Sequence, residues 1–84
     1  MKKIAFIGAG SLQFTSSCVR DLLTFPAFRP CEFALMDINP GNLRNIEKVV
    51  RRIVEKMDCP ACKIIATTDR KAALKDADGV LCTV

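Results

Sequence analysis

A glycine-rich segment near the amino terminus has the residue types and spacing to bind a phosphate group. Gly8-Ala9-Gly10-Ser11-Leu12-Gln13 follows an apolar run at residues 4–7 and precedes a segment with helical periodicity. Gly8 would permit a sharp turn, and Gly10 would let the backbone approach a pyrophosphate closely. The amides of residues 11–13 would then lie at the positive end of a helix, where they can donate hydrogen bonds to an anion.

Position 13 departs from the strict dinucleotide-binding fingerprint, which places glycine or alanine there. Gln13 would keep the helix and the strand further apart than glycine does. The strand, turn and helix around the motif still favour a dinucleotide site, because this context makes a short glycine pattern more specific.

Asp37 is the second residue that could contact a nucleotide. It closes the expected second strand at residues 32–36, where a carboxylate can accept hydrogen bonds from the adenosine ribose and repel a 2′-phosphate. This placement favours NAD over NADP. The interval from Gly8 exceeds the usual spacing of about twenty residues, and a proline-containing loop at residues 25–30 accounts for the excess. A structural alternative stays open, in which the glycines only shape a turn and the acid only caps the next helix.

The cysteines do not predict a metal or catalytic site. Cys59 and Cys62 form a C-x-x-C pair, but tetrahedral zinc takes four ligands and the chain has no histidine. We interpret this pair as structural, and Cys18, Cys31 and Cys82 as small apolar side chains. The odd number of cysteines and the lack of a secretion signal favour reduced thiols. We assign no catalytic residue and no metal ligand to this chain.

The elements that would position these residues alternate between strands and helices. We expect strands at residues 4–7, 32–36, 63–67 and 80–84. Helices are expected from residue 11 to about 24, from Asn39 and Pro40 to 57, and from Asp69 to 75. In the first helix, four-residue spacing predicts an apolar stripe of Phe14, Cys18 and Leu22, with Val19 and Leu23 beside it.

This alternation predicts an α/β fold with right-handed crossovers and a parallel sheet covered by helices on both faces. It corresponds to the first half of a Rossmann-like doubly wound sheet, β-α-β-α-β-α-β. In the usual order the fourth strand returns to the other side of the first, and the ligand crevice lies beyond the carboxyl ends of these two strands. Thr83 and Val84 would then end beside Gly10. Residues 1–84 would form the amino-terminal part of an NAD-binding domain.

The composition of the chain restricts the kinds of partner that it is expected to bind. The chain is 50% apolar and 26% charged, as in ordinary soluble globular proteins. Its formal net charge is +4, but basic residues are scattered among acidic ones and all aromatic residues are phenylalanine, which does not favour nucleic-acid binding. The apolar runs are too short for a signal sequence or a membrane span. We expect a cytoplasmic protein without nucleic-acid or membrane partners.

Four segments carry a resemblance to a known family: KIAFIGAGS at residues 3–11, FALMDI at 33–38, TTD at 67–69 and ALKDAD at 73–78. Together they resemble the amino terminus of family 4 glycoside hydrolases, over the whole chain. The Gly-Ala-Gly-Ser and Leu-Met-Asp-Ile segments look more like the α-galactosidases and α-glucosidases than the 6-phospho-glycosidases. The latter tend toward Gly-Gly-Gly-Ser and Leu-Tyr-Asp.

The resemblance implies a parent enzyme that cleaves glycosides by oxidation, elimination, addition and reduction, with NAD and Mn²⁺. Hydride leaves the sugar C3, the C2 proton is then removed, the aglycone departs, water adds and the hydride returns. In this family a cysteine and a histidine hold the metal and a tyrosine commonly acts as base, all from regions beyond the end of this chain. The resemblance therefore carries over only cofactor positions, which are Gly8, Ala9, Gly10, Ser11, Leu12, Gln13, Asp37, Ile38, Thr83 and Val84.

Two other functions share these features. A 2-hydroxyacid dehydrogenase of the lactate or malate type has the same strand, glycine turn and acid, and an assay of net NAD reduction would distinguish it. A non-catalytic module that senses nicotinamide nucleotides would be complete at Val84. The fourth strand lacks a closing signal, so we expect an inactive piece of a longer, homo-oligomeric enzyme with a small sugar substrate. The sugar and its anomeric preference stay open.

Overall fold

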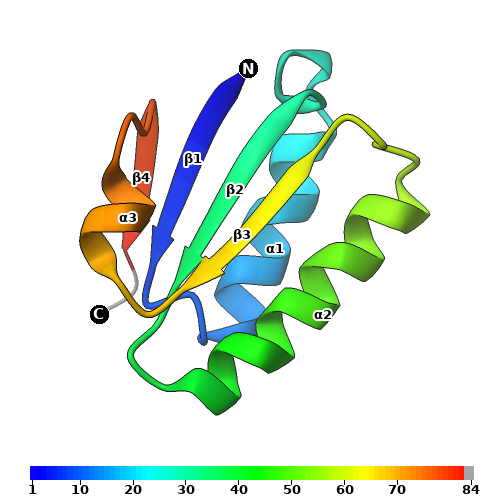
Figure 1. The fold of residues 1–84 in the computed structure, drawn as a ribbon. Helices are drawn as coiled ribbons and strands as arrows, with labels where there is room; N and C mark the ends of the chain where they lie inside the picture. Colours follow the sequence, from blue (N-terminus) through cyan, green and yellow to red (C-terminus); the bar gives the residue numbers. More distant parts are fainter. Residues whose placement is uncertain (83–84) are drawn as a thin grey trace.

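Four short apolar segments form one parallel sheet in the computed structural model, which describes residues 1–82 (Figure 1). The strands are β1 (Lys2–Ile7), β2 (Cys31–Met36), β3 (Lys63–Thr67) and β4 (Gly79–Cys82). Their order is β3-β2-β1-β4, so the fourth strand returns to the far side of the first, as predicted. The expected α/β fold is confirmed, while Thr83 and Val84 lie outside the described residues.

The strand register brings the carboxyl ends of the central strands to one edge. Ile7, the last residue of β1, pairs with Met36 at the end of β2 and with Cys82 at the end of β4. Met36 in turn pairs with Thr67, the last residue of β3. Segments that follow any of these strands therefore begin at the same edge of the sheet.

The helices begin and end where local chemistry predicts. The helix α1 (Leu12–Leu23) stops before the short 3-10 helix η1 (Pro26–Phe28), whose proline lacks an amide donor. The helix α2 (Pro40–Lys56) starts with proline, and Asn39 Oδ1 accepts a hydrogen bond from the Asn42 amide at 3.1 Å. Asp69 caps α3 (Arg70–Leu74) in the same way, through the Lys71 amide at 2.9 Å.

The main core lies between one face of the sheet and the helices α1 and α2, and α3 covers the other face (Figure 1). Successive strand side chains point to opposite faces, so Phe6 and Phe33 enter the main core while Ala5 and Ala34 face α3. The two phenylalanine rings lie 6.1 Å apart between centroids. Alanines on the α3 side let Ala73 pack fully buried against the sheet.

The predicted apolar stripe of α1 is confirmed at Val19 and Leu23 but is wrong at Phe14. Thr15, Val19 and Leu23 are fully buried, whereas Phe14 is 38% exposed. The buried Thr15 hydroxyl donates a hydrogen bond to the Ala9 carbonyl at 2.9 Å, which turns this side of the helix toward the sheet. Cys18 and Leu22, from the predicted stripe, are only partly buried at the border of the core.

Lys3 ties the carboxyl end of α3 to the central strand. Its ammonium donates to the Lys75 carbonyl at 2.6 Å and to the Ala72 carbonyl at 3.3 Å. Its backbone amide donates to Asp78 Oδ2 at 2.8 Å, and its carbonyl accepts from the Asp78 amide at 2.7 Å. These bonds position the connection between α3 and β4. Within residues 1–82, no helix has the length and apolar character needed to cross a membrane.

Candidate functional site

The glycine turn after β1 is held against the end of β2. The amides of Gly8 and Ala9 both donate to the Met36 carbonyl, at 2.9 and 2.8 Å, and the Ser11 amide donates to the Gly8 carbonyl at 3.2 Å. Gly8 has a backbone φ of 79°, which residues other than glycine rarely adopt. The first glycine therefore makes the sharp turn that the sequence predicts.

Gly10 lies directly beside the carboxylate of Asp37. The Gly10 amide donates to Asp37 Oδ2 at 2.8 Å, and the Asn39 amide donates to Asp37 Oδ1 at 2.9 Å. A Cβ atom at position 10 would lie 2.6 Å from Asp37 Oδ2 and 2.9 Å from the Asn42 Cβ, so no side chain fits there. Each carboxylate oxygen can accept a further hydrogen bond, which is what binding to two ribose hydroxyls requires.

The first turn of α1 directs backbone amides toward the same edge. The first amides of a helix have no carbonyl of their own helix to bond. Ser11 adopts an extended conformation before the helix, and its side chain makes no capping hydrogen bond. Ser11, Leu12 and Gln13 are all exposed. This arrangement fits a phosphate group, because the amino-terminal end of a helix is positive and its free amides can donate hydrogen bonds to the phosphate oxygens.

A pocket of about 240 Å³ lies at the carboxyl ends of β1 and β2. Ile38 lines it and is 85% exposed, which is unusual for a large apolar side chain. Arg70, the first residue of α3, also lines this pocket, although no motif in the sequence assigned it to the site. The sequence could have indicated Arg70, because this residue lies three positions after the end of β3 and the carboxyl ends of the strands share one edge of the sheet. The pocket is lined by Ile7, Gly8, Met36, Asp37, Ile38 and Arg70.

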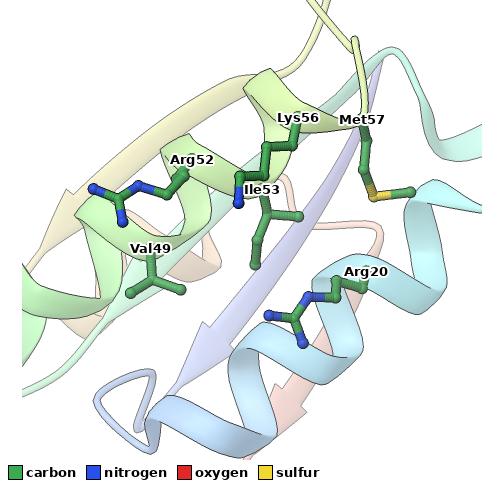
Figure 2. Close-up of a pocket in the computed structure, with 6 residues that line it drawn as sticks. All are labelled: Arg20, Val49, Arg52, Ile53, Lys56 and Met57. Carbon is green, nitrogen blue, oxygen red and sulfur yellow. The ribbon is translucent and has the colours of Figure 1, made fainter.

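A larger groove of about 350 Å³ lies elsewhere, between α1 and α2 (Figure 2). Arg20 approaches it from α1, and Arg52 and Lys56 approach it from α2. Arg20 belongs to the last turn of α1, and Lys56 to the last turn of α2. In a parallel sheet with helical crossovers, these helix ends lie toward the amino ends of the strands. The groove is therefore distant from the glycine turn.

Two cysteine thiols near the amino end of β2 are less acidic than usual. Burial raises the pKa of the Cys31 thiol to about 11, and it also raises the pKa of Cys62. The Cys62 thiol donates to the Arg29 carbonyl at 2.6 Å, and Cys59 is buried. Within residues 1–82, no three potential metal ligands of the Cys, His, Asp or Glu type come together.

Residues 3–84 match the family described as "Family 4 glycosyl hydrolase". The chain belongs to glycosyl hydrolase family 4. The resemblance to family 4 that the four sequence segments carried is thereby confirmed. The matched range overlaps every described helix and strand, from β1 to β4.

Curated relatives of this family 4 chain are glycosidases. It is 44% identical to an alpha-galactosidase of Rhizobium meliloti (strain 1021) over 82 residues, covering 98% of the chain and 16% of the relative. An alpha-galactosidase of Bacillus subtilis (strain 168) is 38% identical over 96% of the chain and 18% of the relative. An alpha-glucosidase of Erwinia rhapontici is 38% identical over 98% of the chain and 18% of the relative. The chain thus spans less than one fifth of each relative's length.

The structure brings most of the expected cofactor positions to one edge of the sheet. The glycine turn, Asp37 and Ile38 meet beyond the carboxyl ends of β1 and β2. Thr83 and Val84 lie outside the described residues. NAD binding at these positions stays a prediction.

Proposed function

We propose that this chain is the nucleotide-binding part of a longer family 4 glycosidase that cleaves α-galactosides or α-glucosides with the help of NAD. The observation that carries the proposal is the hydrogen bond from the Gly10 amide to Asp37 Oδ2. It places a turn suited to phosphate beside a carboxylate suited to ribose. The names of the relatives support the two sugar classes.

In this proposal the pyrophosphate of NAD lies at the start of α1, where it accepts hydrogen bonds from the amides of Leu12 and Gln13, while the Ser11 amide stays bonded to the Gly8 carbonyl. Asp37 accepts hydrogen bonds from the adenosine ribose hydroxyls. A 2′-phosphate would lie against the Asp37 carboxylate, so the site selects NAD over NADP. Gly10 keeps the space between these two contacts open.

When bound, NAD supplies the acceptor and later the donor of a hydride, so that the glycoside is cleaved without net oxidation. The residues of this chain bind and orient the cofactor. We propose that the catalytic base and the ligands for Mn²⁺ belong to the rest of the enzyme, since the relatives are several times longer than the matched segment. Family membership favours this function over a 2-hydroxyacid dehydrogenase.

The test is an assay of the native-length protein with aryl α-galactosides and α-glucosides. We expect cleavage that requires added NAD and Mn²⁺ and that produces no net NADH. Asp37→Ala should weaken NAD binding, whereas Asp21→Ala, which removes an exposed acid on α1, should not. Cleavage that continues after NAD is fully removed would overturn the cofactor assignment. Steady accumulation of NADH would instead support a dehydrogenase.

A further inference from the structure

The pocket beside Asp37 has an unassigned basic residue. Arg70 lines this pocket together with Asp37 and Ile38. It comes from α3, which covers the face of the sheet opposite to α1 and α2. In the described part of the chain, the ion pairs are Lys3 with Glu32 and Glu47 with Arg51. No hydrogen bond or ion pair among residues 1–82 occupies the Arg70 guanidinium. This side chain is therefore available to a ligand.

The shape of a dinucleotide indicates which of its groups would reach this pocket. If the pyrophosphate lies at the start of α1 and the ribose at Asp37, the base extends from the far side of the ribose. The pocket that Asp37 shares with Ile38 and Arg70 adjoins this ribose position and could hold the base. The volume of about 240 Å³ exceeds that of a purine ring.

The chemistry of the lining favours a flat apolar ring over a second phosphate. Ile7, Met36 and Ile38 provide apolar surface, and an 85% exposed Ile38 would gain from being covered. A guanidinium is planar and packs well on aromatic faces. A phosphate at the same place would meet the Asp37 carboxylate at close range and be repelled.

We propose that Arg70 packs its guanidinium on one face of the adenine ring of NAD and that Ile38 supports the ring from another side. Arg70 is then a specificity residue for the adenosine half of the cofactor. This inference rests on the proposed function, since it takes NAD to be the ligand. It adds a contact from α3 to a site built otherwise from β1, α1 and β2.

The experiment measures dissociation constants of the native-length protein by isothermal titration calorimetry. The ligands are NAD, ADP-ribose, which has the adenine, and nicotinamide mononucleotide, which lacks it. We expect Arg70→Ala to weaken binding of NAD and ADP-ribose by about three- to thirtyfold. Binding of nicotinamide mononucleotide should not change. Arg70→Gln, which retains a helix-compatible side chain, should behave like the alanine variant.

Lys71→Ala is the matched control, because it removes the neighbouring cation of α3 and Lys71 does not line the pocket. It should leave all three constants unchanged. Three results would overturn the role of Arg70 while NAD binding by the wild type still stands. These are unchanged ADP-ribose binding in Arg70→Ala, equal weakening for nicotinamide mononucleotide, or equal weakening of NAD and ADP-ribose in Lys71→Ala. A wild-type protein that binds neither NAD nor ADP-ribose would overturn the proposed function itself.

Discussion

The amide of Gly10 lies 2.8 Å from Oδ2 of Asp37, although 27 residues separate them in the sequence. The bond joins the turn after β1 to the end of β2. The two groups expected to contact the phosphates and the ribose of a nucleotide are thus coupled. A change at either position therefore disturbs the other.

Gly10→Ala should reduce NAD affinity at least tenfold and lower stability by about 1–3 kcal/mol. The new Cβ would lie 2.6 Å from Asp37 Oδ2, so the carboxylate must move and the hydrogen bond must break. Titration with NAD and urea unfolding of the same protein measure the two effects. Gly41→Ala is the control, because its Cβ meets only the Asn39 Oδ1 atom at 3.3 Å. Equal affinity in the two variants would contradict the prediction.

Asp37→Ala should weaken NAD binding by about tenfold or more, since hydrogen bonds to a charged acceptor contribute about 1.5–3 kcal/mol. The preference for NAD over NADP should also fall, because the 2′-phosphate no longer meets a carboxylate. Titration of both nucleotides into each variant measures this preference. If the ratio of the two dissociation constants stays as in the wild type, Asp37 does not select the ribose.

Thr15→Val should destabilise the protein by about 1–3 kcal/mol, because it leaves the buried Ala9 carbonyl without its hydroxyl donor. Valine has nearly the same volume, so packing changes little. Chemical denaturation reports the free energy of unfolding. Thr68→Val, at an exposed position, should change it by less than about 0.5 kcal/mol. Similar values for the two variants would mean that the Thr15 bond contributes nothing.

Lys3→Met should lower the free energy of unfolding by about 1–2 kcal/mol, because the carbonyls of Ala72 and Lys75 lose a charged donor. The ion pair with Glu32 is 3.8 Å long and adds little. Hydrogen exchange should increase first in α3. The control is Lys2→Met at an exposed position, which should leave exchange in α3 as it is.

Stability should fall as the pH rises from about 9 toward 11. Burial raises the pKa of Cys31 from 9.0 to about 11, so the unfolded chain releases this proton first and gains stability relative to the folded chain. Below pH 9 both states hold the proton and Cys31 adds no pH dependence. Unfolding measured at pH 8 and pH 10 should show a smaller loss in Cys31→Ala than in the wild type. Equal losses would show that Cys31 titrates normally.

The sequence predicted the features that depend on neighbouring residues. The caps at Asn39 and Asp69, the sharp turn at Gly8 and the end of α1 before Pro26 all follow from backbone chemistry within a few positions. Apolar runs between them indicated strands, and the alternation of strands and helices was sufficient for the parallel α/β fold. These features need no information about distant contacts.

Tertiary structure decided which distant residues meet and which face of a helix is buried. Spacing alone could not distinguish the Phe14 stripe of α1 from the Thr15 stripe, because both repeat every four residues. The Thr15 bond to Ala9 chooses between them. Arg70 reaches the pocket of Asp37 only because β3 lies beside β2 and the strands end at one edge. Sheet order and register set these contacts, and they depend on packing across the whole fold.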